Sequence, residues 1–223
     1  MSEPEFVLVS AEELARAQEL PLPAALPVLP LKETVVLPGT MTPLAIGQER
    51  SLTLIDDIVR SDRLVALHCV CDPEVPTPGW DDIYPVGSGA FVHRMIRVPD
   101  GTVGVVVQGL RRVLATRHLQ EAPYLVSEVE VVPDVVEAND LETLTRTAQE
   151  LYARVVGFVP YLPPELHIAA ATVTDPSTLC HLIASTLRLE AEQKQRLLEL
   201  PDVEQRLRDV LLLLDHELEF VVD

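Results

Sequence analysis

The feature that most constrains this fold is a change in the spacing of apolar residues near residue 134. Residues 27–133 contain short apolar or alternating runs that end at Pro, Gly or Asp, as strands do. From residue 138 to residue 223, apolar residues repeat at helical spacing. An acidic link, residues 134–139, separates the two parts. We therefore predict an α+β chain: a β-rich lobe at 27–133 with mostly antiparallel strands and one helix, then an α-helical bundle lobe at 138–223.

Within the β-rich part, one hairpin has a clear turn. Pro99-Asp100-Gly101 combines a preset φ, a local hydrogen-bonding side chain and a residue that tolerates positive φ. Strict alternation along the strand before it places Val92, Ile96 and Val98 on one face. Phe91, His93, Met95 and Arg97 fall on the other. The first face is the more apolar, so we expect it to be the core. The single helix is expected from about residue 48 to residue 60.

The helical part shows several start and stop signals. Asp175-Pro176 predicts an N-cap followed by Pro at the first helical position, and Asp202 with Gln205 predicts another helix start. The last helix has no Gly or Pro terminator before Asp223. We expect this helix to continue in the full-length protein.

Residues 1–26 look like an acidic extension. Ser10-Ala11-Glu12-Glu13 is a plausible capping box for a short helix. Several prolines follow and prevent a longer helix. We expect this extension to be flexible.

Composition limits the function classes. Nearly half of the residues are apolar, which allows a sizeable core. The formal net charge of −18 disfavours nucleic acid or an anionic membrane surface as a partner, because both would be repelled. Three cysteines without a regular spacing, no basic leader and no long apolar span favour a cytoplasmic protein.

A series of short motifs resembles one known family. The opening Leu29-Pro30-Leu31-Lys32-Glu33-Thr34-Val35-Val36-Leu37-Pro38-Gly39 is followed, in order, by Asp82-Ile83-Tyr84, Pro99-Asp100-Gly101-Thr102 and Gln108-Gly109-Leu110-Arg111-Arg112. Leu162-Pro163-Pro164-Glu165 and Asp202-Val203-Glu204-Gln205-Arg206-Leu207 continue the series. Together they resemble the N-terminal, substrate-binding domain of Lon-type ATP-dependent proteases over roughly residues 27–220.

The resemblance carries expectations about fold and function. In that family the domain has a small β-barrel-like (PUA-like) lobe and then a helical lobe. It helps to capture unfolded, damaged or degron-bearing proteins and supports assembly of a hexameric ring. The alternative from another class is a stand-alone adaptor or chaperone-like protein with the same fold. Neither reading requires a cofactor.

The chain offers no catalytic centre of its own. Its two lysines, Lys32 and Lys194, do not follow glycine, so neither fits a Walker A loop. Neither has a credible serine partner for a Ser-Lys dyad. We expect no catalytic residues, and thus no enzyme activity from this chain.

A metal site is the main chemical alternative. His68, Cys69, Cys71 and Asp72 offer ligand types within five residues, and His93, His118 and Cys180-His181 lie elsewhere. Alternation on a strand points His68 away from both cysteines. Buried, structural cysteines are the simpler interpretation, and we expect no metal.

Client binding needs exposed apolar surface, because unfolded proteins display apolar segments. The candidate substrate-binding residues lie near turns or on the mixed strand face. They are Met41, Trp80, Tyr84, Phe91 and Met95.

Overall fold

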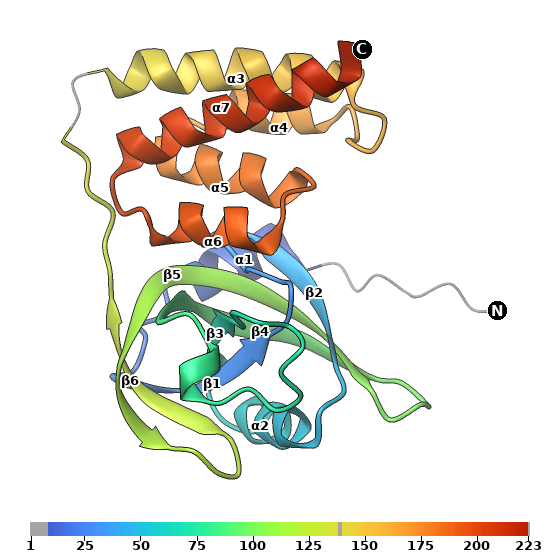
Figure 1. Ribbon diagram of the computed structural model, residues 1–223, viewed down its shortest axis with the longest axis vertical. Coiled ribbons are helices and arrows are strands. Elements are labelled where there is room, and N and C mark those ends of the chain that lie inside the picture. Colours follow the sequence, from blue (N-terminus) through green and yellow to red (C-terminus); the bar gives the residue numbers. More distant parts are fainter. Residues whose placement is uncertain (1–8, 138–139, 223) are drawn as a thin grey trace. The chain divides into compact units, whose positions relative to one another are not determined.

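The computed structural model describes residues 9–137 and 140–222. The chain divides into two compact units, Met1–Val131 and Val132–Asp223 (Figure 1). The first unit contains all the strands of the described residues, and the second contains five helices. The chain is therefore α+β with a mixed sheet.

The first unit is built on a six-stranded sheet with the order β2-β5-β4-β3-β1-β6. The strands are β1 (Ala25–Leu31), β2 (Met41–Ile46), β3 (Leu64–Cys69), β4 (Val86–Arg97), β5 (Val103–Gln120) and β6 (Leu125–Val131). β1 and β3 run parallel, and the other paired strands are antiparallel.

Strand β5 is long enough to pair with both outer strands of the sheet order, β2 and β6. It has 18 residues. The part from Val103 to Gln108 pairs with β2, and the part from Val113 to Gln120 pairs with β6. The pairings β5-β4-β3-β1-β6 therefore return to β5, with β2 added at its side.

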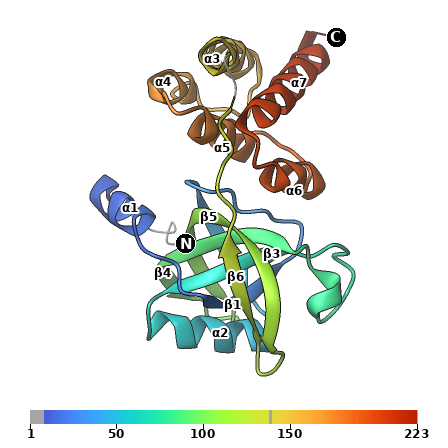
Figure 2. The same ribbon diagram turned by 90° about the vertical axis from the view of Figure 1, so that its left-hand side faces the viewer.

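Apolar side chains are buried on both faces of the sheet. One core cluster joins Val92, Val105 and Val107 to the helix α2 (Glu49–Val59), through Leu54 and Ile55 among others. The second cluster lies on the other side of these strands and includes Ala17 of the helix α1 (Ala11–Gln18). Figure 2 shows α1 and α2 on different sides of the strands.

The predicted hairpin turn is confirmed. β4 ends at Arg97 and β5 begins at Val103. Gly101 has a φ of +89°, a conformation that glycine adopts without steric cost. The Asp100 carboxylate accepts a hydrogen bond from the backbone N–H of Thr102 at 2.9 Å.

The predicted face pattern of β4 was wrong. The register of β4 against β5 shifts between Val92 and Arg94, as in a β-bulge. The extra residue reverses the alternation, so Met95 packs against the same cluster as Val92. Ile96 and Val98, which we expected in the core, are 49% and 41% exposed. A second register shift between β4 and β5 lies between Gly89 and Ala90.

The flexibility expected for residues 1–26 stays a prediction; residues 1–8 lie outside the described residues, and the described part contains α1 and packs against the first unit. Ser10 and Glu13 form the predicted capping box of α1. Ala17 is only 3% exposed, and the Gln18 side chain donates to the Leu110 carbonyl at 2.8 Å. Strand β1 already begins at Ala25. Sequence reasoning missed this packing because α1 has few apolar residues.

The second unit consists of helices. They are α3 (Leu141–Phe158), α4 (Leu166–Thr172), α5 (Pro176–Thr186), α6 (Ala191–Glu199) and α7 (Val203–Val222). α3 and α7 pack together, and α5 packs against both (Figure 1). Helix starts follow the predicted caps: Asp175 accepts from the Thr178 N–H at 2.8 Å, and Asp202 accepts from the Gln205 N–H at 3.1 Å.

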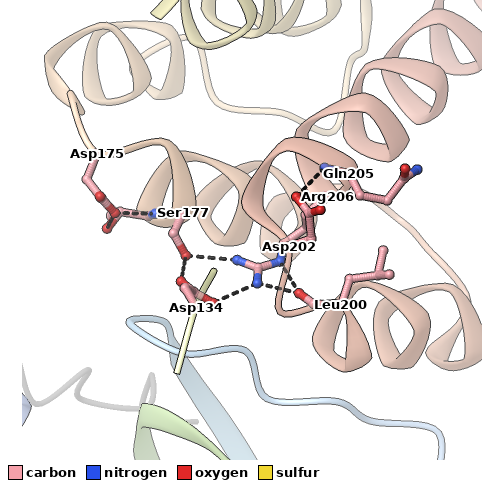
Figure 3. Close-up of polar contacts among 8 residues, drawn as sticks. Asp134, Asp175, Ser177, Leu200, Asp202, Gln205 and Arg206 are labelled. Atoms are coloured by element: carbon pink, nitrogen blue, oxygen red, sulfur yellow. Dashed lines mark hydrogen bonds and ion pairs between the residues drawn. The ribbon is translucent and has the colours of Figure 1, made fainter. Parts of the chain in front are cut away.

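A buried arginine ties the start of this unit to its helices. Arg206 is 0% exposed and donates to Asp134 at 2.7 Å, to the Ser177 hydroxyl at 2.8 Å and to the Leu200 carbonyl (Figure 3). Val135, which follows Asp134, donates its backbone N–H to the Pro201 carbonyl, and its own carbonyl accepts from the Val203 N–H. The acidic link is therefore held at Asp134 by an ion pair in which the Arg206 side chain is buried and the Asp134 side chain is 30% exposed.

Candidate functional site

Two of the predicted site residues, Met41 and Phe91, lie on the same face of the sheet. Each pairs with Gln108 of β5, from opposite sides. Residues paired directly across strands point to the same face. Met41, Gln108 and Phe91 thus form one row on the face that α1 covers. Met41 and Phe91 are both half-buried.

Gln108 is the polar centre of that row. It is 3% exposed. Its amide nitrogen donates to the Leu14 carbonyl at 3.1 Å and to the Gln18 side-chain oxygen at 3.0 Å. Its amide oxygen lies 2.7 Å from His93 Nε2. Since an amide oxygen only accepts, Nε2 of His93 carries the hydrogen.

Two arginines complete the contacts to the N-terminal segment. Arg111 donates to the Gln18 carbonyl at 2.8 Å and to the Leu20 carbonyl. A cation at this end of α1 satisfies carbonyls that the helix leaves free and opposes the negative end of its dipole. Arg94, beside the bulge, donates to Glu13 at 2.8 Å.

The Glu13–Arg94 pair has an electrostatic consequence. The hydrogen bond from Arg94, with those from Ser10, lowers the pKa of Glu13 from 4.5 to about 2. Both side chains are part-exposed, so water screens their attraction.

The other three predicted site residues lie elsewhere. Trp80, in the short 3-10 helix η1 (Trp80–Asp82), stacks on the His118 ring at 3.8 Å. The Tyr84 carbonyl accepts from His68 Nδ1 at 2.9 Å. Met95 packs on the α2 side of the sheet. Met95 and Phe91 therefore point to opposite faces, contrary to the alternation we predicted.

The residues of the possible metal site do not gather into a ligand set. Among the residues that the structure describes, no group of three or more His, Cys, Asp or Glu side chains could hold a metal ion. His68 is fully buried, and burial lowers its pKa to about 4. Cys69 is buried too, whereas Cys71 is exposed.

The opening motif surrounds a hollow of about 370 Å³. It is bordered by the end of β1, by β2 and by the start of α2. The residues lining it include Leu29, Lys32, Thr34, Gly47 and Gln48.

Sequence reasoning missed the residues that hold the N-terminal segment. Gln108 and Arg111 appeared only as members of one family-like motif, without a role of their own. The capping box at Ser10 was the one local indication that residues 10–18 form an ordered helix.

Comparison with known proteins identifies the family. Residues 25–216 match the family described as "ATP-dependent protease La (LON) substrate-binding domain". The chain belongs to this LON substrate-binding domain family. The resemblance inferred from the sequence motifs is thereby confirmed.

Full-length relatives are Lon proteases. The chain is 36% identical to Lon protease of Dictyoglomus thermophilum over 211 residues, which are 94% of this chain and 26% of that protein. It is 36% identical to Lon protease of Trichlorobacter lovleyi over 208 residues, 90% of this chain and 25% of that protein. The chain thus spans about a quarter of the length of the curated relatives it matches.

Solved structures of LON N-terminal domains share the fold. The N-terminal domain of the Mycobacterium avium complex Lon protease superposes with a TM-score of 0.72 and 25% identity, covering 86% of this chain and 98% of that one. A Lon N-terminal domain protein from Xanthomonas campestris gives 0.59 and 20% identity, covering 84% and 96%. The second likeness concerns the fold alone. None of the described helices is long and apolar enough to cross a membrane.

Proposed function

We propose that this chain is the non-catalytic substrate-binding domain of a Lon-type protease and that it binds unfolded, damaged or degron-bearing polypeptides. The observation that supports this most strongly is the match of residues 25–216 to the LON substrate-binding domain family. The chain itself hydrolyses neither ATP nor peptide bonds under this proposal. It needs no cofactor and acts in the cytoplasm.

The architecture we propose for this role is a barrel-like lobe followed by a helical bundle. The cyclic strand pairing through β5 and β6 supports the first part. The mutual packing of α3, α5 and α7 supports the second. The boundaries we propose remain 27–133 and 138–223.

We further propose that the helical unit supports assembly of a homo-oligomeric ring. α7 carries two exposed apolar side chains two turns apart, Leu212 at 68% and Phe220 at 73%. A hollow of about 400 Å³ lies between α6 and α7 and includes Leu197 and Leu213 in its lining. Exposed apolar surface of this kind is typical of contacts between subunits.

For client binding, the candidate contact residues remain Met41, Trp80, Tyr84, Phe91 and Met95. Met41 and Phe91 have the best support, because they lie in one row of one face. The apolar side chains of Met41 and Phe91 at this face would contact apolar segments of a client.

A binding measurement tests the proposal. Reduced and carboxymethylated α-lactalbumin, which cannot refold, should bind the chain in a saturable way by fluorescence anisotropy. Native α-lactalbumin with its calcium bound is the matched control and should not bind. Equal binding of both forms, or of neither, would contradict the proposal.

A further inference from the structure

The segment from Ser10 to Leu22 lies against the β4–β5 face of the sheet. Its helical part, α1, presents Ala17 to the second core cluster, and its extended part adds Leu20 and Leu22. The sheet therefore already binds one short polypeptide segment, which belongs to the same chain.

Much of this recognition is independent of sequence. Gln108 donates to the Leu14 carbonyl, and Arg111 donates to the carbonyls of Gln18 and Leu20. Backbone carbonyls are present in any polypeptide. Side chains that donate to carbonyls can therefore hold segments of many sequences.

An apolar contact adds selectivity. A Cβ on Gly89 would lie 2.5 Å from a Leu22 methyl carbon. Glycine at this position lets the Leu22 side chain rest directly on the strand in its present position. This face thus accepts a bulky apolar residue there.

Charge adds a second preference. This face presents Arg94 and Arg111, although the chain as a whole carries a formal net charge of −18. The segment supplies Glu13 to Arg94. A segment that combines apolar and acidic residues suits this surface.

Three features of the segment favour its displacement. α1 has only 8 residues, a length at which a helix is marginal without packing. Leu14, Leu20 and Leu22 are only partly buried, and the ion pair is part-exposed. Local opening of such a segment requires little of the unit's stability.

We propose that this β4–β5 face is the polypeptide-binding groove of the domain, and that segment 10–22 occupies it until an apolar, acidic segment of an unfolded protein displaces it. The inference rests on the proposed function, since it names the site and the control of client binding. It explains why half-buried Met41 and Phe91 lie beside the segment.

A reversible lock tests the proposal. The variant Leu22→Cys/Gly89→Cys, with Cys71→Ser to remove the exposed native thiol, places two thiols where the Leu22 side chain now contacts Gly89. Oxidation should fix the segment in the groove. The dissociation constant for reduced, carboxymethylated α-lactalbumin should rise at least about tenfold, and dithiothreitol should restore it.

A loosened variant gives the opposite result. Leu22→Asp places a carboxylate against the apolar floor and should lower the same dissociation constant about tenfold. Ala15→Asp, on the exposed side of α1, is the matched control and should leave binding unchanged. Circular dichroism checks that each variant is folded. A labelled peptide copying residues 9–24 should bind the loosened variant and not the oxidised lock.

The outcomes separate this inference from the function on which it rests. If α-lactalbumin binds the wild type, the oxidised lock and the loosened variant equally, the groove is not the client site, while the proposed function stands. If no variant binds it, both fail. The Leu22→Asp variant could instead form a dimer in which each copy places its segment 10–22 on the other copy. Such a dimer in light scattering, without tighter binding of α-lactalbumin, would also overturn the inference.

Discussion

At the scale of single residues, a few polar side chains decide how each unit is held. In the first unit, the Gln108 side-chain oxygen accepts a hydrogen bond from His93, and its side-chain nitrogen donates one to the Leu14 carbonyl of the N-terminal segment. In the second, Arg206 is buried with donors directed at Asp134, Ser177 and Leu200. Buried polar groups need such partners, because an unsatisfied one is costly.

Glu13 should make the attachment of α1 dependent on pH. Its pKa is lowered to about 2 in the folded chain, so the ion pair stabilises the fold above about pH 4.5 and is lost as the pH falls toward 2. Glu13→Gln should therefore lower the melting temperature slightly at pH 7 and have little effect at pH 2. Melting curves across this range measure the difference.

The control for Glu13 is Glu12→Gln. Glu12 pairs with Arg16 within the same helix, and both side chains are about three-quarters exposed. Glu12→Gln should change the melting temperature very little at either pH. A Glu13→Gln effect that is the same at pH 7 and pH 2 would contradict the assigned role of the ion pair.

Arg206 should be far more important for stability than its neighbour Arg208. Arg206→Leu removes the guanidinium that donates to the Leu200 carbonyl, to the Ser177 hydroxyl and to Asp134, and we expect a loss of about 3 kcal/mol. Arg208→Leu breaks only a surface pair with Glu204 and should cost less than about 1 kcal/mol. Urea unfolding of both variants compares them. Equal losses would show that the contacts of Arg206 stabilise the unit no more than a surface ion pair does.

At the scale of elements, the bulge in β4 decides which side chains face the core. Before it, Val92 and Phe91 follow the ordinary alternation. After it, the alternation is reversed, so Met95 faces the α2 side and Ile96 faces solvent. One extra residue thus moves a whole hairpin end from one face to the other.

Adjacent substitutions should reveal this reversal. Met95→Asp places a charge against a core cluster, and we expect a loss of about 2 kcal/mol. Ile96→Asp, at a position 49% exposed, should cost about 0.5 kcal/mol or less. Thermal melting of the two variants compares these losses. A larger loss for Ile96→Asp than for Met95→Asp would mean that strict alternation holds along this strand.

At the scale of the whole molecule, the exposed apolar residues concern self-association. Leu212 and Phe220 lie eight residues apart on α7, two turns along one side of the helix. An exposed apolar stripe of this size favours weak contact between copies rather than a stable hexamer of this chain alone.

We therefore expect a monomer in weak equilibrium with a dimer. Light scattering should show a mass that rises with concentration, and Leu212→Glu/Phe220→Glu should remove that rise. Ile168→Glu, at an exposed apolar position on α4, is the matched control and should leave it unchanged. A hexamer that does not depend on concentration would contradict this expectation.

The sequence alone was sufficient for features that depend on neighbouring residues. Helix starts at Ser10, Asp175 and Asp202 follow from side chains that accept hydrogen bonds from the next turn. The turn at Gly101 follows from the conformational freedom of glycine. The family followed from motifs in their order along the chain. The caps and the turn are local signals, and the motif series is a property of the sequence order, so no knowledge of tertiary contacts is required.

Only the tertiary structure decided what residues 9–24 do and which way Met95 points. Gln18 and Gln108 are 90 residues apart in the sequence, and nothing in either pattern indicates their hydrogen bond. The reversal after Val92 depends on how β4 pairs with β5, because a bulge is a property of two strands together. Periodicity describes one strand at a time. It could not show that the segment expected to be free lies over the face proposed to bind clients.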